Sequence, residues 1–256
     1  MNNKSHGNHS NENPVVLVTG SAQRIGATIV KTLHAAGYNT IIHYRNSKEP
    51  AETLAKELNI LRANSATCIT AELDKIDAIN LLAETALSVW GRIDALVNNA
   101  SSFYATPIGT ATEIEWADLV NSNMKVPFFL AQALSASLTA TRGAIINITD
   151  VYADKPLAHH TIYCMAKSGN TMLTKSLAIE LSPHVRVNGI APGAILWPDQ
   201  GGAMAPADQQ QLLAKIPLAR TGLPEDIANT VLFLLRDAPY ITGQIIAIDG
   251  GRSVNF

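Results

Sequence analysis

Tyr163 and Lys167 are separated by three residues, a spacing that could support proton transfer. Residues at positions i and i+4 lie on one face of a helix, so a phenol and an ammonium group would meet there. A neighbouring positive charge favours the phenolate and lowers the pKa of a tyrosine. A phenol tuned in this way can donate a proton while a hydride arrives from a cofactor. Because isolated Y-x-x-x-K patterns are common and usually structural, the interpretation depends on a cofactor site elsewhere in the chain.

The segment TGSAQRIG, residues 19–26, is the first candidate for such a cofactor site. It follows the apolar run VVLV and precedes a helical pattern. A glycine at the end of a strand permits a tight turn, and the amino end of the next helix favours a pyrophosphate. Gly20 and Gly26 form only part of the usual G-x-G-x-x-G pattern, so a simple tight turn is the alternative interpretation.

The segment HYRNS, residues 43–47, follows the second apolar run. NAD-binding sheets commonly place a carboxylate here for the ribose 2′-hydroxyl, whereas an arginine accommodates the 2′-phosphate of NADP. No acidic residue lies between this run and Glu49, and the segment offers Arg45, Asn46 and Ser47. The sequence therefore predicts NADPH as the cofactor, with a solvated surface charge as the alternative interpretation of Arg45.

Strands and helices alternate along the chain and must position these residues. Strands are expected at 15–19, 39–44, 66–70, 93–97, 144–149, 185–190 and 244–248, and helices at about 25–33, 51–61, 76–90, 113–140 and 161–181, with two more after an irregular stretch at 192–206. Continuous apolar strands that alternate with helices predict a parallel sheet covered on both faces. The fold class is therefore α/β, a single doubly wound Rossmann-type domain of about seven parallel strands.

Composition excludes several classes of protein. The chain has 256 residues, 47% of them hydrophobic and 16% charged, with a net charge of -2. This composition does not fit a disordered chain, and the charge gives no general attraction to nucleic acids or anionic membranes. No apolar run is long enough to span a bilayer. The two cysteines form no disulfide framework or metal-ligand pattern, which favours a reducing, cytoplasmic location.

Residues 1–13 are polar and rich in asparagine, so we expect a disordered tail before a single domain at 14–256. His6 and His9 could be interpreted as a weak metal site, but a solvated tail is the simpler explanation. We expect no metal, no nucleic-acid partner and no membrane partner.

Taken together, these motifs resemble the short-chain dehydrogenase/reductase family over about residues 14–254. The resemblance also includes NNA at 98–100, Asn123, VRVNGIAPG at 185–193 and ITGQIIAIDGG at 241–251. It implies a nicotinamide cofactor and a homotetramer. It also implies that Tyr163 donates the proton, that Lys167 holds the nicotinamide ribose and lowers the phenol pKa, and that Asn123 supports a proton-relay water. The expected cofactor contacts, besides Lys167 and residues 45–47, are Gly20, Arg24, Ile25, Glu72, Leu73, Asn99, Ala100, Ser101, Pro192 and Gly193.

Two departures from the general family pattern resemble the pteridine reductase subgroup. Arg24 replaces a common glycine, and Asp150 stands where most members carry a catalytic serine. A carboxylate would repel the oxyanion that forms in carbonyl reduction, but it suits a substrate with basic ring nitrogens. The segments NNASSFY and PLAHHTIYCMAK carry the same resemblance.

The subgroup resemblance implies a role for each substrate-binding residue. Phe103 would stack on the pterin, Ser101 would hydrogen-bond it, and Arg24 would reach between cofactor phosphate and substrate. Asp150 and Tyr163 would deliver protons to ring nitrogens. The structural alternatives are loop packing for Phe103 and Ser101, a surface charge for Arg24, and a helix cap for Asp150.

The sequence therefore predicts an NADPH-dependent pteridine reductase that converts a dihydropterin to its tetrahydro form, with oxidised pterins and dihydrofolate as further candidate substrates. One alternative is a 3-oxoacyl or other carbonyl reductase of the same family. Another is a dinucleotide-sensing protein without catalysis, which has no need of the proton relay that Tyr163, Lys167 and Asn123 suggest. We expect Trp197 and the 194–206 segment to shape a substrate lid, and Cys164 to be a buried, inert thiol.

Overall fold

The computed structural model of the protein describes residues 13–196 and 205–255. The expected polar tail lies almost wholly outside the described residues, as do Trp197 and most of the expected lid. A helix long and apolar enough to cross a membrane does not occur within the described ranges.

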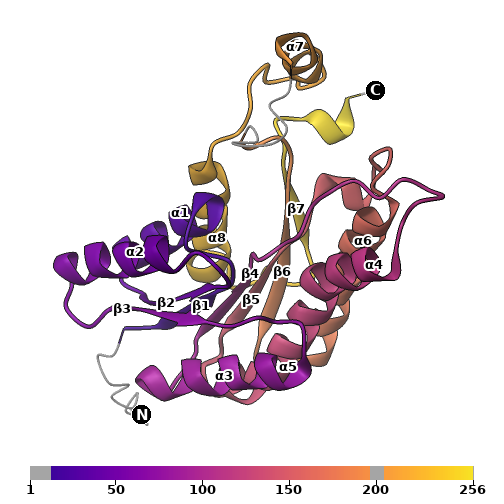
Figure 1. Ribbon diagram of the computed structural model, residues 1–256. Helices are drawn as coiled ribbons and strands as arrows, with labels where there is room; N and C mark the ends of the chain where they lie inside the picture. The colour runs from indigo at the N-terminus through magenta and orange to yellow at the C-terminus, as the bar shows by residue number, and fades with distance from the viewer. Residues whose placement is uncertain (1–12, 197–204, 256) are drawn as a thin grey trace, which may run out of the picture.

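Seven strands form one parallel sheet in the order β3-β2-β1-β4-β5-β6-β7 (Figure 1). Their bounds are β1 Val15–Val18, β2 Asn39–Tyr44, β3 Ala66–Thr70, β4 Ala95–Asn98, β5 Ala144–Ile148, β6 Arg186–Pro192 and β7 Ile245–Ile248. The predicted sheet is confirmed, and no strand end differs from the expected one by more than two residues. The strand order reverses between β1 and β4, which is where ligands bind in open α/β sheets.

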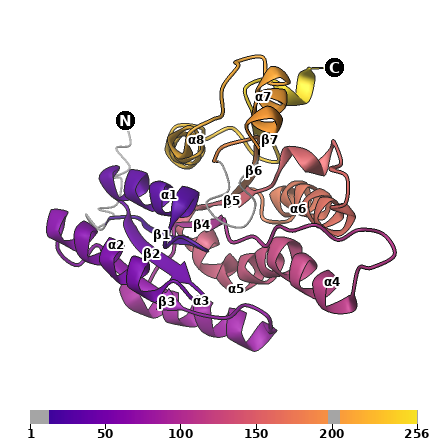
Figure 2. The same ribbon diagram turned by 45° about the horizontal axis from the view of Figure 1, so that its top comes forward.

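Two layers of helices cover the sheet (Figures 1 and 2). One layer contains α1 (Arg24–Ala35), α2 (Lys48–Leu61) and α8 (Pro224–Arg236), and the other contains α3 (Ile76–Trp90), α5 (Val126–Thr141) and α6 (Thr161–Glu180). Side chains of a strand alternate between the two faces, so β1 contributes Val16 and Val18 to one apolar core and Val15 and Leu17 to the other. The side chains of both cores are buried from solvent, and the two cysteines of the chain are free.

The helical stretch expected at 113–140 is interrupted. It consists of α4 (Glu113–Val120), a π-helical turn at Asn121–Lys125, and α5. Thr112 and Glu115 form a capping box that starts α4. Short π-helical turns are often found at functional sites, and this one contains Asn123.

Short helical elements flank the carboxyl edge of the sheet. The 3₁₀-helix η2 (Val151–Ala153) joins β5 to α6, and α7 (Pro206–Ala214) precedes α8. A second 3₁₀-helix, η3 (Arg252–Val254), follows β7. These elements bring the end of the chain to the same edge as the loops that carry the predicted site.

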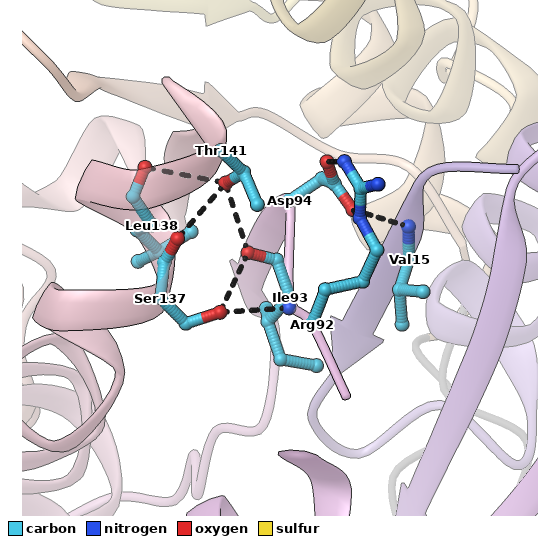
Figure 3. A network of polar contacts seen from close by, with 7 residues as sticks. All are labelled: Val15, Arg92, Ile93, Asp94, Ser137, Leu138 and Thr141. Atoms are coloured by element: carbon cyan, nitrogen blue, oxygen red, sulfur yellow. Dashed lines mark hydrogen bonds and ion pairs between the residues drawn. The ribbon is translucent and has the colours of Figure 1, made fainter. Parts of the chain in front are cut away.

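A polar network ties the amino edge of the sheet together (Figure 3). Asp94 accepts hydrogen bonds from Val15 N at 2.8 Å and from Arg92 Nε at 2.9 Å. Ile93 N donates to Ser137 Oγ at 2.9 Å, and Thr141 Oγ1 donates to Ile93 O at 3.1 Å. The network joins β1, the segment before β4 and α5, at the edge opposite to the predicted site.

Candidate active site

A cleft of about 710 Å³ lies at the carboxyl ends of the first four strands. Its lining contains the predicted cofactor residues from these loops, namely Gly20, Arg24, Ile25, Arg45, Asn46, Ser47, Glu72, Leu73, Asn99, Ala100 and Ser101. Residues that are far apart in the sequence therefore line one cavity at the expected place in the fold.

The first loop of this cleft depends on two glycines. Gly20 has φ +60°, and a Cβ atom there would lie 2.8 Å from Ala100 Cα. A Cβ atom on Gly26 would lie 2.5 Å from Gly20 O. Any side chain at either position would clash with the backbone. A simple tight turn would not require glycine at both positions, whereas a loop packed closely against its neighbours does.

The amino end of α1 faces this loop. Arg24, the first residue of α1, has φ +54°. The first turn contains no acidic residue, and the N-cap residue Gln23 makes no side-chain capping hydrogen bond. The helix dipole and backbone N–H groups at this end suit an anionic group.

Thr19 and Asn99 bind the loops after β1 and β4 to each other. Thr19 Oγ1 accepts hydrogen bonds from the N–H groups of Asn99 and Ala100, both at 3.0 Å. Asn99 Nδ2 donates to Thr19 O and Gly20 O, both at 2.9 Å. Asn99 thus lines the cleft and also builds it, since its amide group holds the turn that shapes the cavity.

His43 is a structural residue of the cleft to which the sequence analysis gave no role. Its Nδ1 accepts a hydrogen bond from Gly20 N and its Nε2 donates to Ala71 O, both at 3.1 Å. Burial lowers the pKa of His43 to about 4, and the Ala71 carbonyl opposes this shift. The neutral imidazole therefore joins β2 to the loops after β1 and β3. The signal in the sequence was a histidine that directly follows two isoleucines in the strand pattern NTIIHY.

Asp150 and Tyr163 form a direct pair. Tyr163 Oη donates a hydrogen bond to Asp150 Oδ2 at 2.6 Å. Asp150 Oδ1 accepts a hydrogen bond from Tyr152 N at 2.8 Å and caps η2. The same side chain therefore caps the helix and contacts the phenol. Burial raises the pKa of Asp150, while hydrogen bonds from Tyr163 and Tyr152 and the charges of Lys167 and Arg252 oppose that rise.

The pKa of the Tyr163 phenol is raised in this structure, opposite to the net lowering that the spacing of Tyr163 and Lys167 suggested. Burial raises the pKa of Tyr163 and the Asp150 carboxylate raises it further, while a hydrogen bond with Ser101 opposes them. Lys167 Nζ donates to Ile148 O at 2.9 Å and lies 5.6 Å from the centre of the Tyr163 ring. Its own pKa falls to about 8 because it is buried. The arrangement keeps the phenol protonated, as a proton donor requires.

Asn123 is buried in the π-helical turn, and its side-chain amide is hydrogen-bonded to neighbouring segments. Its Nδ2 donates to Ser102 O and Leu119 O, both at 2.9 Å. Its Oδ1 accepts from Ser101 Oγ at 2.7 Å. Asn123 thereby fixes the loop that carries Ser101, and its expected support of a water molecule stays a prediction.

Phe103 lies beside Tyr163. Its ring is 54% exposed and its centroid is 4.8 Å from that of Tyr163, at an interplanar angle of 75°. His160 stacks on the Phe103 ring at 4.9 Å and 17°. Thr106 N donates to His159 O at 2.6 Å and holds the Phe103 loop against the segment before α6. An exposed ring fixed in this way fits a binding platform better than core packing, and sequence reasoning had left His160 without a role.

Pro192 and Gly193 lie at the end of β6, at the same edge but outside the lining of the 710 Å³ cleft. Gly193 N donates to Ile248 O at 2.9 Å, and a Cβ atom on Gly193 would lie 2.7 Å from Asp249 Cβ. Their contact with a cofactor stays a prediction. Cys164 is buried, with Leu157 N donating to its Sγ at 3.4 Å, in keeping with the expected buried thiol.

The fold and this site define a class of proteins, and the comparison with known families agrees. A family model described as "Enoyl-(Acyl carrier protein) reductase" matches residues 20–253. The chain belongs to the short-chain dehydrogenase/reductase family, and it is therefore an oxidoreductase that uses NAD(P)H.

Several curated relatives are similar along nearly the full chain. Pteridine reductase 1 of Leishmania tarentolae is 38% identical, covering 94% of this chain and 96% of the relative. The 3-oxoacyl-[acyl-carrier-protein] reductase FabG of Staphylococcus aureus is 37% identical, covering 92% of this chain and 96% of the relative. A putative ketoacyl reductase of granaticin polyketide synthesis from Streptomyces violaceoruber is 33% identical, covering 94% of this chain and 96% of the relative. The family is clear, and the relatives include both pterin and ketoacyl reductases.

Proposed function

We propose that the protein is an NADPH-dependent pteridine reductase that converts a dihydropterin to its tetrahydro form, with oxidised pterins and dihydrofolate as further candidate substrates. The observation that carries the proposal is the hydrogen bond of 2.6 Å between Tyr163 and Asp150, next to the exposed ring of Phe103. A buried carboxyl group can serve basic ring nitrogens, whereas beside a ketone it would oppose the developing oxyanion.

The cleft fits a phosphorylated dinucleotide. Gly20 and Gly26 leave space that any Cβ atom would fill, and α1 points its amino end at the cleft. Arg45 and Ser47 line the cleft at the carboxyl end of β2, where a carboxylate would be expected for NAD. These residues would hold the pyrophosphate and the 2′-phosphate, and the bound nicotinamide would supply a hydride to a carbon of a pterin C=N bond.

The protein's own side chains would supply the matching proton. Tyr163 would donate its phenolic proton to the ring nitrogen as the neighbouring carbon receives the hydride, so the C=N bond becomes a CH–NH unit. Asp150, which accepts the phenolic hydrogen bond, would return a proton from solvent to Tyr163. Lys167 keeps its place through Ile148 O and stabilises the transient negative charge on the phenol.

Phe103 would orient the substrate. Its ring lies edge-on to Tyr163, and His160 covers one of its faces. A planar pterin could stack on the exposed part of the ring, and such a contact contributes roughly 0.5–1.5 kcal/mol beyond the burial of area. Ser101, which donates to Asn123, would contact the polar edge of the substrate.

Ketoacyl reduction is the second candidate function, because FabG of Staphylococcus aureus is 37% identical to this chain. The test is to follow NADPH oxidation with dihydrobiopterin, dihydromonapterin, dihydrofolate and an acetoacetyl thioester in parallel, with NADH as a matched cofactor. Turnover of a pterin with a preference for NADPH supports the proposal. Turnover of the thioester alone would favour the ketoacyl reductase, and tight NADPH binding without any turnover would favour a dinucleotide sensor.

We also propose that the protein forms a homotetramer, as the family resemblance implies. Met165, Met172 and Ile179 are exposed on α6 at seven-residue intervals, and Phe128 is exposed on α5. Apolar side chains repeated along one face of a helix suit a contact with another subunit. Light scattering on the purified protein tests this, and a monomer at micromolar concentration would contradict it.

A further inference from the structure

The end of the chain makes a defined turn beside the catalytic pair. Asp249, which follows β7, accepts hydrogen bonds from Gly251 N at 2.9 Å and from Ser253 N at 2.6 Å. Arg252 N donates to Asp249 O at 3.2 Å. The backbone that carries Arg252 is thus fixed by three bonds to one residue.

From this fixed backbone position, the side chain of Arg252 contacts Tyr152 in η2. Its Nη2 donates a hydrogen bond to Tyr152 Oη at 3.0 Å, and its Cζ lies 5.2 Å from the centre of the Tyr152 ring. An arginine over an aromatic face is attracted by the ring quadrupole in addition to any hydrogen bond. Both partners are half-buried, so solvent screens the contact less than at an open surface.

Tyr152 connects this contact to the reacting groups. Its backbone N–H donates to Asp150 Oδ1 at 2.8 Å, while Asp150 Oδ2 accepts from Tyr163 Oη at 2.6 Å. One oxygen of the Asp150 carboxylate therefore accepts a hydrogen bond from the Tyr152 backbone, and the other accepts one from the Tyr163 phenol. A shift of Tyr152 would change the orientation of Asp150 toward Tyr163.

We propose that Arg252 is a positioning residue for proton delivery, which holds η2 through Tyr152 and adds a positive charge to the surroundings of Asp150. The inference rests on the proposed roles of Asp150 and Tyr163. No part of the family resemblance or of the proposed function assigned a role to Tyr152 or Arg252.

The charges around Asp150 predict the direction of the effect. The titratable groups that act on it are Tyr163 and Lys167 from α6 and Arg252 from η3, and the backbone N–H of Tyr152 in η2 acts as well. Burial raises the pKa of Asp150, and the charges of Lys167 and Arg252 lower it. Removing the charge of Arg252 leaves Lys167 as the remaining cation of this set, so the pKa of Asp150 must rise further.

The experiment compares Arg252→Gln and Arg252→Lys with Arg236→Gln as the matched control. Arg236 pairs with Asp237 at the exposed end of α8 and does not line the cleft. We expect Arg252→Gln to move the inflection of the pH profile of kcat/KM that belongs to the Asp150–Tyr163 pair upward by about half a pH unit or more. Arg252→Lys should restore most of the wild-type profile, and Arg236→Gln should leave it unchanged.

A second readout does not depend on turnover. Titration of the aspartate carboxyl groups by ¹³C NMR should show the same upward shift for Asp150 in Arg252→Gln, and Tyr152→Phe should weaken the contact while keeping the ring. A drop in kcat with an unmoved profile and an unmoved Asp150 titration would overturn the proposal, since a merely structural role predicts that result.

Failure of the proposed function gives a different pattern. If wild-type protein reduces the acetoacetyl thioester and no pterin, the pteridine reductase assignment fails. The pH profiles with the thioester and the NMR titration then still decide whether Arg252 acts on Asp150. A shift specific to Arg252→Gln supports the inference in that case too, and its absence refutes it.

Discussion

The two edges of the sheet use buried polar groups in opposite ways. At the amino edge, Asp94 is paired with Arg92 and with the backbone of Val15, so the segment before β4 is tied to β1 (Figure 3). At the carboxyl edge, Asp150 is half-buried and Lys167 is buried, and burial raises the pKa of Asp150 and lowers that of Lys167. Satisfied pairs at the amino edge stabilise the fold, whereas groups at the carboxyl edge are held in states that favour proton transfer.

The contrast extends to the loops. The amino edge closes with short segments such as the one before β4, and its hydrogen bonds involve Ile93, Ser137 and Thr141. The carboxyl edge opens into a cleft of about 710 Å³ whose walls come from the loops after the first four strands and from α4 and the π-helical turn. We expect substitutions at the two edges to separate stability from activity, and the predictions below test this separation from the largest expected effect to the smallest.

Tyr163→Phe should have the largest effect on activity. Removing the phenolic oxygen removes the proposed proton donor, and positioned general acids contribute roughly 10²–10⁴-fold to a rate. We expect kcat to fall by about 10³-fold while the dissociation constant of NADPH stays within about threefold. Single-turnover kinetics measures the first and fluorescence titration the second. A kcat close to that of the wild type would exclude Tyr163 as the donor.

His43 should make stability depend on pH. Its folded pKa is about 4 against an ordinary 6.5, so the unfolded chain takes up the proton first as the pH falls. The stabilisation is complete above pH 6.5 and is lost as the pH falls toward 4, by up to about 3 kcal/mol. Urea unfolding across this range measures the loss.

The His43→Gln variant is the control for this dependence of the free energy of unfolding on pH. Glutamine carries a donor and an acceptor but no titratable group, so the stability difference between wild type and variant should shrink as the pH falls. Equal slopes for the two proteins would show that His43 is not buried in its neutral form.

Asp94→Ala should reduce stability and leave catalysis unchanged. The substitution leaves Val15 N without this acceptor and removes the ion pair between Asp94 and Arg92. An unsatisfied buried donor costs about 1–3 kcal/mol, and we expect a loss of this size in the free energy of unfolding. The values of kcat/KM at a temperature where the variant is folded should match the wild type. A loss of activity in folded protein would show that the two edges are coupled.

Phe103→Ala should have the smallest effect of these. Loss of a stacking contact of roughly 0.5–1.5 kcal/mol corresponds to a rise of about 2- to 13-fold in KM for the pterin. We expect kcat to change less, because Phe103 holds the substrate and does not transfer a proton. Phe103→Tyr keeps the ring and serves as the matched control. An unchanged KM would show that Phe103 does not stack on the substrate.

Part of this molecule could be predicted from its sequence because the signals are local. The β-branched run before Gly20 and the apolar run that ends at Tyr44 place two strands within a residue or two of their observed ends. The glycine turn and the i, i+4 spacing of Tyr163 and Lys167 placed the cleft and the catalytic helix. Such patterns involve only a few neighbouring residues, so they can be recognised in a single sequence.

Other features depend on burial and on contacts between distant segments. The spacing of Tyr163 and Lys167 suggested a lowered phenol pKa, but the depth of the site and the Asp150 carboxylate raise it. Arg252 contacts Tyr152 across 100 residues of sequence. The π-helical turn around Asn123 interrupts a helical pattern that carries no local signal for it. None of these can be derived from periodicity alone.

The most direct test of the central claim is the ratio of kcat/KM for dihydrobiopterin to that for an acetoacetyl thioester, measured for the wild type and for Asp150→Ser. Serine can still cap η2, so the substitution removes the carboxyl group while retaining a capping side chain. We expect the wild-type ratio to favour the pterin and to fall by about 10²-fold or more in the variant. A ratio that stays the same in Asp150→Ser would contradict the account, because the carboxylate would then have no part in selecting or reducing a pterin.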